Sequence, residues 1–249
     1  MPESILNLRD VAITVNDFLG QPLLKEGALY RSAHIDNASI EDRIFISRGL
    51  GIKRVLDLRS RSEQIPRIDG LPLQIAHVES LIWIAISAGI MQAKEFVTRN
   101  VVVPLGLSRL TIDGIGYSQP ELAAAIRTLI RQPAVPVLVH CAQGKDRTGL
   151  VIALVLMLLD CPRAAIEHDY HLSDNEITIE RAEKLANLRQ KGLTQDFART
   201  ANDLIEGLEE YLDMQYGGVC GFANKVGITD GEMEELKELL LVDPKKKAL

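Results

Sequence analysis

The hydrophobic positions of this chain fall into short runs separated by polar turns. Two runs rich in β-branched and aliphatic residues, at 53–58 (KRVLDL) and 135–140 (VPVLVH), predict buried strands, because a strand covered on both faces is almost continuously apolar. Weaker strand patterns occur at 11–15 and 27–31. The first part of the chain therefore predicts the strands of a sheet.

Helical spacing dominates the rest of the pattern. Apolar residues recur every three or four positions over 119–131, and Ser118 and Glu121 have the S-x-x-E spacing of a capping box at its start. Residues 150–159 are ten consecutive apolar positions, which predict a helix buried on all sides. Further helices are predicted at 162–172, 176–190 and 200–216, with a last one that opens on a second capping box, Thr229 to Glu232, and runs to about 241.

This order of elements predicts an α/β fold with a central, mostly parallel sheet flanked by helices and a helical C-terminal part. The 249 residues can bury a sizeable core and contain no internal repeat or long linker. We therefore expect a single domain over 1–243, followed by a basic, disordered tail at 244–249.

Composition narrows the class of protein. Apolar residues make up 47% of the chain and charged residues 25%, which excludes a disordered protein. A net charge of -6 disfavours nucleic acid as a partner. No apolar run reaches the roughly 20 residues that a membrane span needs. The three cysteines form no CxxC pair, which fits a reducing, cytoplasmic setting.

One polar stretch, VHCAQGKDRTG at 139–149, interrupts two apolar elements. It lies between a predicted strand and the start of a predicted helix, where backbone N–H groups converge and favour an anion. Arg147, six residues after Cys141, could bind two oxygens of a phosphate. The same positive surroundings would stabilise a Cys141 thiolate and make it a nucleophile. Neither of the other two cysteines is followed by an arginine at this spacing.

Other site chemistries fit less well. A nucleotide-binding loop has the pattern GxxxxGK followed by Ser or Thr. Here Val139 stands where the first glycine would be and Asp146 where the Ser or Thr would be, so the pattern does not match. His168 and His171 share a helix face, but no second pair of ligands with suitable spacing accompanies them. We therefore predict no metal and no cofactor.

The segment from His140 to Thr148 resembles the signature of the cysteine-dependent protein tyrosine phosphatase superfamily, HC-x5-R followed by Ser or Thr. Its GKDR version is similar to the atypical microbial branch of tyrosine and phosphoinositide phosphatases. The resemblance implies the protein tyrosine phosphatase fold. Shorter segments agree with that branch: NLRD at 7–10, YRSA at 30–33, VLDLR at 55–59 and DYHLS at 169–173.

The resemblance also implies roles for individual residues. Cys141 would attack phosphorus to form a phosphocysteine, and Arg147 would stabilise the transferred phosphoryl group. The Thr148 hydroxyl would bond the sulfur, and His140 would hold the loop and tune the thiol. A glycine at 144 suits a loop whose amides converge on one anion, so a larger residue there should be damaging. Backbone donors for phosphate would come, with Arg147, from Ala142, Gln143, Gly144, Lys145 and Asp146.

The proton donor has two candidates, because the WPD tripeptide common in the superfamily does not occur here. Asp113 lies in a glycine-bearing stretch, 111–116, which could be a mobile catalytic loop or an ordinary turn. Asp146, inside the signature, could donate the proton or could merely orient Arg147. Both assignments remain open.

Three basic residues could contact the substrate. Lys145 could lie at the rim of the site and favour substrates with several phosphates, or it could be a solvated lysine. Arg59 and Arg61 follow the strand at 53–58, at the edge where ligands bind in parallel sheets, or they could form surface salt bridges. The predicted function is hydrolysis of a phosphate monoester, first of phosphotyrosine in a protein. Phosphoinositide or dual-specificity activity, and a catalytically weak phosphate-binding scaffold, are the alternatives; the oligomeric state is not predicted.

Overall fold

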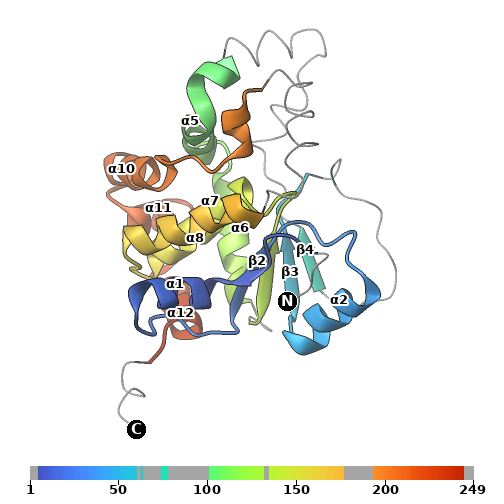
Figure 1. The fold of residues 1–249 in the computed structure, drawn as a ribbon. Helices are drawn as coiled ribbons and strands as arrows, with labels where there is room; N and C mark the ends of the chain where they lie inside the picture. The colour runs from blue at the N-terminus through green and yellow to red at the C-terminus, as the bar shows by residue number, and fades with distance from the viewer. Residues whose placement is uncertain are drawn as a thin grey trace.

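The computed structural model describes residues 5–60, 63, 74–77, 101–131, 135–176 and 193–243. Over these ranges the strands form one five-stranded sheet in the order β1-β2-β5-β3-β4 (Figure 1). Strands β2, β5, β3 and β4 are parallel, and β1 pairs antiparallel with β2. The predicted α/β class with a mostly parallel sheet is confirmed. The strands are β1 (Arg9–Asp10), β2 (Leu29–Ser32), β3 (Arg54–Asp57), β4 (Gln74–His77) and β5 (Val137–His140).

The predicted strands at 27–31, 53–58 and 135–140 correspond to β2, β3 and β5. Every residue of β3 and β5 is buried, because helices cover both faces of the sheet. The central position of β5 has a further consequence. The segment that follows it begins at the middle of the sheet edge, between the ends of β2 and β3.

Most helices pack on one face of the sheet, where the larger core lies, while α2 and the turn after it cover the other face (Figure 1). The smaller core on that second face includes Ile46, Val55 and Leu138. The helices are α1 (Val11–Leu19), α2 (Ile40–Ile44), α5 (Val103–Ile115), α6 (Gln119–Ile130), α7 (Asp146–Leu158), α8 (Arg163–Glu176), α10 (Leu204–Tyr216), α11 (Val219–Lys225) and α12 (Asp230–Leu240), with short helical turns η1 (Phe45–Gly49) and η4 (Gln195–Ala198).

Helix α7 is the buried helix that the apolar run predicted. Its residues from Leu150 to Leu156 are at most 3% exposed, and it packs against α6, α8, α11 and β5. A helix enclosed in this way cannot shift without disturbing several neighbours. Its first turn, which belongs to the signature, is therefore held in a fixed direction.

The strand predicted at 11–15 is wrong, because these residues form the first half of α1. Val11 and Val15, four residues apart, are both fully buried on one helix face. The Asp10 side chain caps the helix by accepting a hydrogen bond from the Ala12 N–H at 2.8 Å, and Gly20 ends it in the left-handed conformation. The helix cap and the four-residue spacing of the buried valines outweigh the β propensity of these residues.

The two predicted capping boxes had different outcomes. At α12, Thr229 Oγ1 accepts from the Glu232 N–H at 3.2 Å, and Glu232 Oε2 accepts from the Thr229 N–H at 2.8 Å, so this box is confirmed. At α6 the helix starts as predicted, but the Ser118 side chain makes no capping bond. Its backbone there, at φ -120° and ψ 21°, departs from the extended conformation that a capping residue usually adopts.

The predicted helices at 162–172 and 200–216 correspond to α8 and α10, and α11 was not predicted. The helix predicted at 176–190 lies outside the described residues except for its first position, as does the tail at 244–249. Within the described ranges, no helix has the length and apolar character needed to cross a membrane.

Candidate active site

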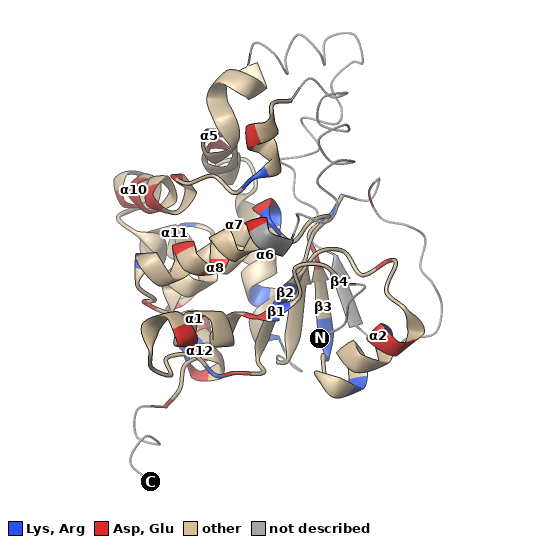
Figure 2. Ribbon diagram, in the orientation of Figure 1, with Lys and Arg blue, Asp and Glu red and all other residues tan. Residues whose placement is uncertain are grey.

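The signature loop, residues 141–145, joins the carboxyl end of β5 to the start of α7. Strands β2 and β3 run parallel to β5 on either side, so the segments that follow them meet this loop. The His34 N–H donates to the Ala142 carbonyl at 3.3 Å, and the Leu58 N–H donates to the His140 carbonyl at 2.9 Å. Figure 2 shows acidic and basic residues gathered at the start of α7.

Cys141 begins the signature loop, and Arg147 follows shortly after its end. Cys141 is buried, and Arg147 lies in the first turn of α7. Burial opposes the charge of Arg147, but hydrogen bonds to Glu63 and the electrostatic attraction of Cys141 outweigh it and raise the pKa of Arg147. The guanidinium bonds Glu63 in a bidentate manner, with Nη1 to Oε2 and Nη2 to Oε1 both at 2.8 Å. Nη1 also donates to the Leu58 carbonyl at 3.2 Å.

Glu63 is a site residue that the sequence analysis missed. The Ser60 N–H and hydroxyl donate to its Oε2 at 3.0 and 2.8 Å. Burial would raise the pKa of Glu63, but the hydrogen bonds from Arg147 and Ser60 outweigh it and hold that pKa at about 2. The sequence signal for Glu63 was its position shortly after β3. Strand β3 is the neighbour of β5, which leads into the signature. The parallel-sheet rule places both at the same edge.

Gly144 occupies a position where other residues do not fit. Its φ is +66°, and a Cβ built there would lie 2.2 Å from the Ser32 carbonyl oxygen. The left-handed backbone alone would cost a non-glycine residue about 1 kcal/mol or more. The close approach to β2 excludes even a methyl group unless the loop moves.

Lys145 does not lie at the rim of the site, and the expectation that it is a rim or solvated lysine is wrong. Its side chain is fully buried, and Nζ donates to the carbonyls of Phe197 and Arg199 at 3.0 and 2.8 Å. Asp146 Oδ1 lies 3.3 Å from the same nitrogen. Lys145 therefore ties the signature loop to the segment around η4.

His140 and Thr148 are both buried next to the loop. His140 Nδ1 lies 3.3 Å from the Cys141 carbonyl oxygen and 3.9 Å from Asp57. Burial lowers the pKa of His140 in spite of Asp57, so the ring is neutral at pH 7. Thr148 Oγ1 has no hydrogen-bond partner in the part of the chain that the structure describes.

The two candidate proton donors lie in different surroundings. Asp146 begins α7 and is 21% exposed, paired with Lys145. Asp113 is not in a loop: residues 111–115 are the last turns of α5, so the predicted mobile loop is wrong. Its carboxylate pairs with Arg109 at 2.9 Å, one helical turn away, and it interacts electrostatically with Tyr211 of α10.

Arg59 is buried and engaged by carboxylates. Its guanidinium pairs with Asp57 at 2.8 Å and forms a second ion pair with Asp36. Burial would lower the pKa of Arg59, but these two partners outweigh it and raise it. Arg59 thus fixes the segment after β2 to the end of β3. Arg61 lies outside the described residues.

The two histidines considered as metal ligands have other partners. His168 stacks on Phe18 with ring centroids 4.8 Å apart, and His171 Nδ1 lies 2.7 Å from Thr200 Oγ1. Across the described ranges, no group of three or more His, Cys, Asp and Glu residues could hold a metal ion.

Comparison with known proteins identifies the family. Residues 2–242 match the model of the tyrosine phosphatase family. A tyrosine-protein phosphatase of Nostoc commune is 28% identical over 219 residues, covering 84% of this chain and 73% of the relative. The triple specificity protein phosphatase PtpB of Mycobacterium tuberculosis is 28% identical over 274 residues, covering 94% and 96%. The chain therefore belongs to the tyrosine phosphatase family, as its signature predicted.

The chain is also similar to solved structures. One of them is the core catalytic domain of the PP-IP phosphatase SIW14 from S. cerevisiae in complex with citrate, at 17% sequence identity and a TM-score of 0.40. The match covers 81% of this chain and 91% of that one. The family assignment rests on the sequence match and not on this likeness.

Proposed function

We propose that this protein hydrolyses phosphotyrosine in proteins through a phosphocysteine intermediate on Cys141. The observation that carries the proposal is the position of Cys141 directly after the central strand and of Arg147 in the first turn of α7, in a chain of the tyrosine phosphatase family. A cysteine directly before a helix start, with an arginine in the first turn of that helix, is an arrangement in which cysteine acts as a nucleophile.

The reaction has two displacements. In the first, the Cys141 thiolate attacks phosphorus, the bond to the tyrosine oxygen breaks, and a carboxylic acid gives that oxygen its proton. Arg147 and the loop amides hold the non-bridging oxygens as charge moves onto them. In the second, water attacks the phosphocysteine and gives a proton to the same carboxylate. The S–P bond breaks, phosphate leaves and the thiolate is restored.

Three neighbours support the two central residues. Glu63 fixes the plane of the Arg147 guanidinium through two hydrogen bonds of 2.8 Å. Neutral His140 contacts the Cys141 carbonyl and so holds the start of the loop. We assign the Thr148 hydroxyl to the departing sulfur in the second step.

We assign the proton donor to Asp146 rather than Asp113. Asp146 precedes Arg147 directly and is partly exposed at the start of α7. Asp113 lies in α5 beyond its kink at Gly106, where its carboxylate is engaged by Arg109. A donor must come within hydrogen-bond reach of the leaving oxygen, and Asp113 would first have to give up this ion pair.

Phosphotyrosine is our first substrate class because Lys145, whose charge would favour several phosphates, is bonded to two carbonyls and to Asp146. Phosphoinositides and phosphoserine or phosphothreonine are the second candidates, since one relative is named a triple specificity protein phosphatase. A binding protein without turnover is the remaining alternative.

The decisive experiment measures phosphate release from a phosphotyrosine peptide, a phosphothreonine peptide and phosphoinositide vesicles. Wild type is compared with Cys141→Ser, Asp146→Asn and Asp113→Asn. We expect turnover to vanish in Cys141→Ser, to fall about 100-fold in Asp146→Asn, and to stay near wild type in Asp113→Asn. If wild type binds these ligands but releases no phosphate, the protein is a phosphate-binding scaffold and not an enzyme.

We also place this activity in the cytoplasm. Cys141, Cys161 and Cys220 are all free thiols, as expected in a reducing compartment. Fractionation of the native cells tests this assignment. Detection of the protein in an oxidising compartment would contradict it.

A further inference from the structure

Behind the signature loop lies a polar network built from distant segments. Asn7 Nδ2 donates to the carbonyl oxygens of Gln143 and Gly144, both at 3.0 Å. Arg31 is fully buried on β2, and its Nη2 donates to the same Gly144 oxygen at 2.8 Å. Two side chains from the N-terminal part of the chain thus hold two successive carbonyls of the loop through three hydrogen bonds.

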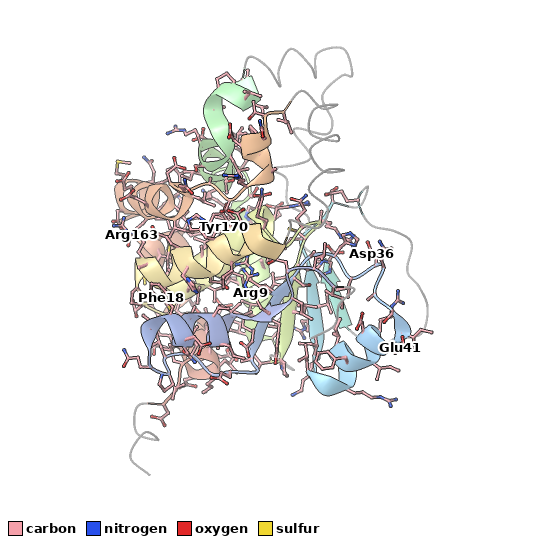
Figure 3. All side chains as sticks on the ribbon, in the orientation of Figure 1. Arg9, Phe18, Asp36, Glu41, Arg163 and Tyr170 are labelled. Atoms are coloured by element: carbon pink, nitrogen blue, oxygen red, sulfur yellow. The ribbon has the colours of Figure 1, made fainter. Side chains whose placement is uncertain are left out.

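Asp169 of α8 fixes these donors from the other side. It pairs with Arg9 Nε at 3.0 Å and with Arg31 Nη1. Arg9 in turn donates to the Asn7 amide oxygen, which leaves the amide nitrogen to face the loop carbonyls. Arg9 also donates to the Asp169 carbonyl at 2.6 Å. Figure 3 shows Arg9 between the start of α1 and helix α8.

The direction of the loop carbonyls decides the direction of its N–H groups. In a trans peptide unit the C=O and N–H bonds point to opposite sides. Holding the carbonyls of Gln143 and Gly144 backward therefore aims the N–H groups of Gly144 and Lys145 forward. A charged donor on the Gly144 carbonyl also polarises that peptide and strengthens the opposite N–H as a donor.

We infer that Asn7 and Arg31 are positioning residues that aim the Gly144 and Lys145 amides at the phosphoryl group. This inference rests on the proposed function of the signature loop as the phosphate site. The network does more than stabilise the fold. Its hydrogen bonds end on the carbonyls of the two peptide units whose N–H groups must face the anion. It also gives a role to three short segments, NLRD, YRSA and DYHLS, that resemblance alone left unexplained.

The test variant is Asn7→Gly in the full chain. Asn7 has φ +59°, which glycine adopts without strain, so the change deletes the amide alone. We expect inhibition by orthovanadate to weaken at least about tenfold and kcat/KM for p-nitrophenyl phosphate to fall about 100-fold, because loss of one oxyanion donor costs about 100-fold or more in kcat. Arg31→Lys, which cannot bond both Asp169 and Gly144 in the same way, should show a similar loss.

The matched control is Asn16→Ala. Asn16 is a buried asparagine of α1 whose side chain bonds the Leu24 carbonyl and the N–H groups of Leu23 and Leu24, none of them in the loop. It should lower the melting temperature and leave orthovanadate inhibition unchanged. If Asn7→Gly and Arg31→Lys lower the melting temperature but keep wild-type inhibition and kcat/KM, the inference is overturned while the proposed function stands. If wild type itself neither binds orthovanadate nor turns over, both are overturned.

Discussion

The signature loop is held differently at its back and at its rim. At the back, Asn7 and Arg31 bond main-chain carbonyls, and both side chains are buried. At the rim, Arg147 bonds the carboxylate of Glu63, whose side chain is 35% exposed. The back sets the course of the main chain, whereas the rim sets the direction of charged side chains.

This difference predicts unequal tolerance to change. A main-chain geometry is shared by every amide of the loop, so an error at the back affects all of them together. A rim ion pair orients one side chain, and partly exposed pairs contribute little to stability because water screens them. Substitutions at the back should therefore cost more activity than those at the rim.

The largest effect is expected for Gly144→Ala. The new Cβ would lie 2.2 Å from the Ser32 oxygen, so the loop must leave β2 and turnover should fall at least about 100-fold. The matched control is Gly20→Ala, whose φ of +64° is nearly the same but whose Cβ would meet nothing within 4 Å. It should cost about 1 kcal/mol of stability and no activity. Equal activity losses in the two variants would refute the steric argument.

A smaller effect is expected for Glu63→Gln at the rim. The amide can accept only one of the two hydrogen bonds from Arg147, so the guanidinium loses its fixed plane. We expect kcat to fall about tenfold, with a small but measurable loss of melting temperature at pH 7, because the ion pair is partly exposed. Steady-state kinetics with a phosphotyrosine peptide would show this. Glu232→Gln, which neutralises the partly buried partner of Arg127, is the control and should leave kcat unchanged.

The third effect concerns stability more than catalysis. Lys145→Met removes the donor to the Phe197 and Arg199 carbonyls and should cost about 1–3 kcal/mol, since buried acceptors are left unsatisfied. Amide hydrogen exchange should rise over 195–201. Lys237→Met, at a more exposed lysine paired with Asp160, should change stability by less than about 0.5 kcal/mol. Unaltered exchange at 195–201 would contradict the tether.

The smallest effect is a pH dependence carried by Glu63. Its pKa is about 2 in the folded protein, against an ordinary value of 4.5. A depressed folded-state pKa stabilises the fold above the unfolded value, and this contribution disappears as pH falls toward 2. The melting-temperature difference between wild type and Glu63→Gln should therefore shrink between pH 6 and pH 3. A difference that grows with acid would show the sign to be wrong.

Features encoded in contiguous sequence were predictable here. The strand at 135–140, the buried helix after it and the C-x5-R spacing lie in one stretch, and each is defined by its immediate neighbours. The capping box at Thr229 succeeded for the same reason. The box at Ser118 failed because the spacing alone does not determine the backbone angles of the residue before the helix.

Features that depend on packing between distant segments were not predictable. Lys145 reads as a rim lysine until the carbonyls of Phe197 and Arg199, more than fifty positions later, are placed beside it. Asp113 directly precedes a glycine-bearing stretch that favours a loop, yet the segment is helical and packs against α10. Glu63 became visible only once β3 was known to neighbour β5.

The supports of the loop come from both sides of the signature in the chain. Asn7 and Arg31 are synthesised long before Cys141, while Asp169, which holds Arg31, emerges only afterwards. A ribosome-bound chain that ends before α8 contains Cys141 but lacks one of the residues that hold the signature loop in place. Hydrolytic competence should therefore arrive only after α8 has been synthesised.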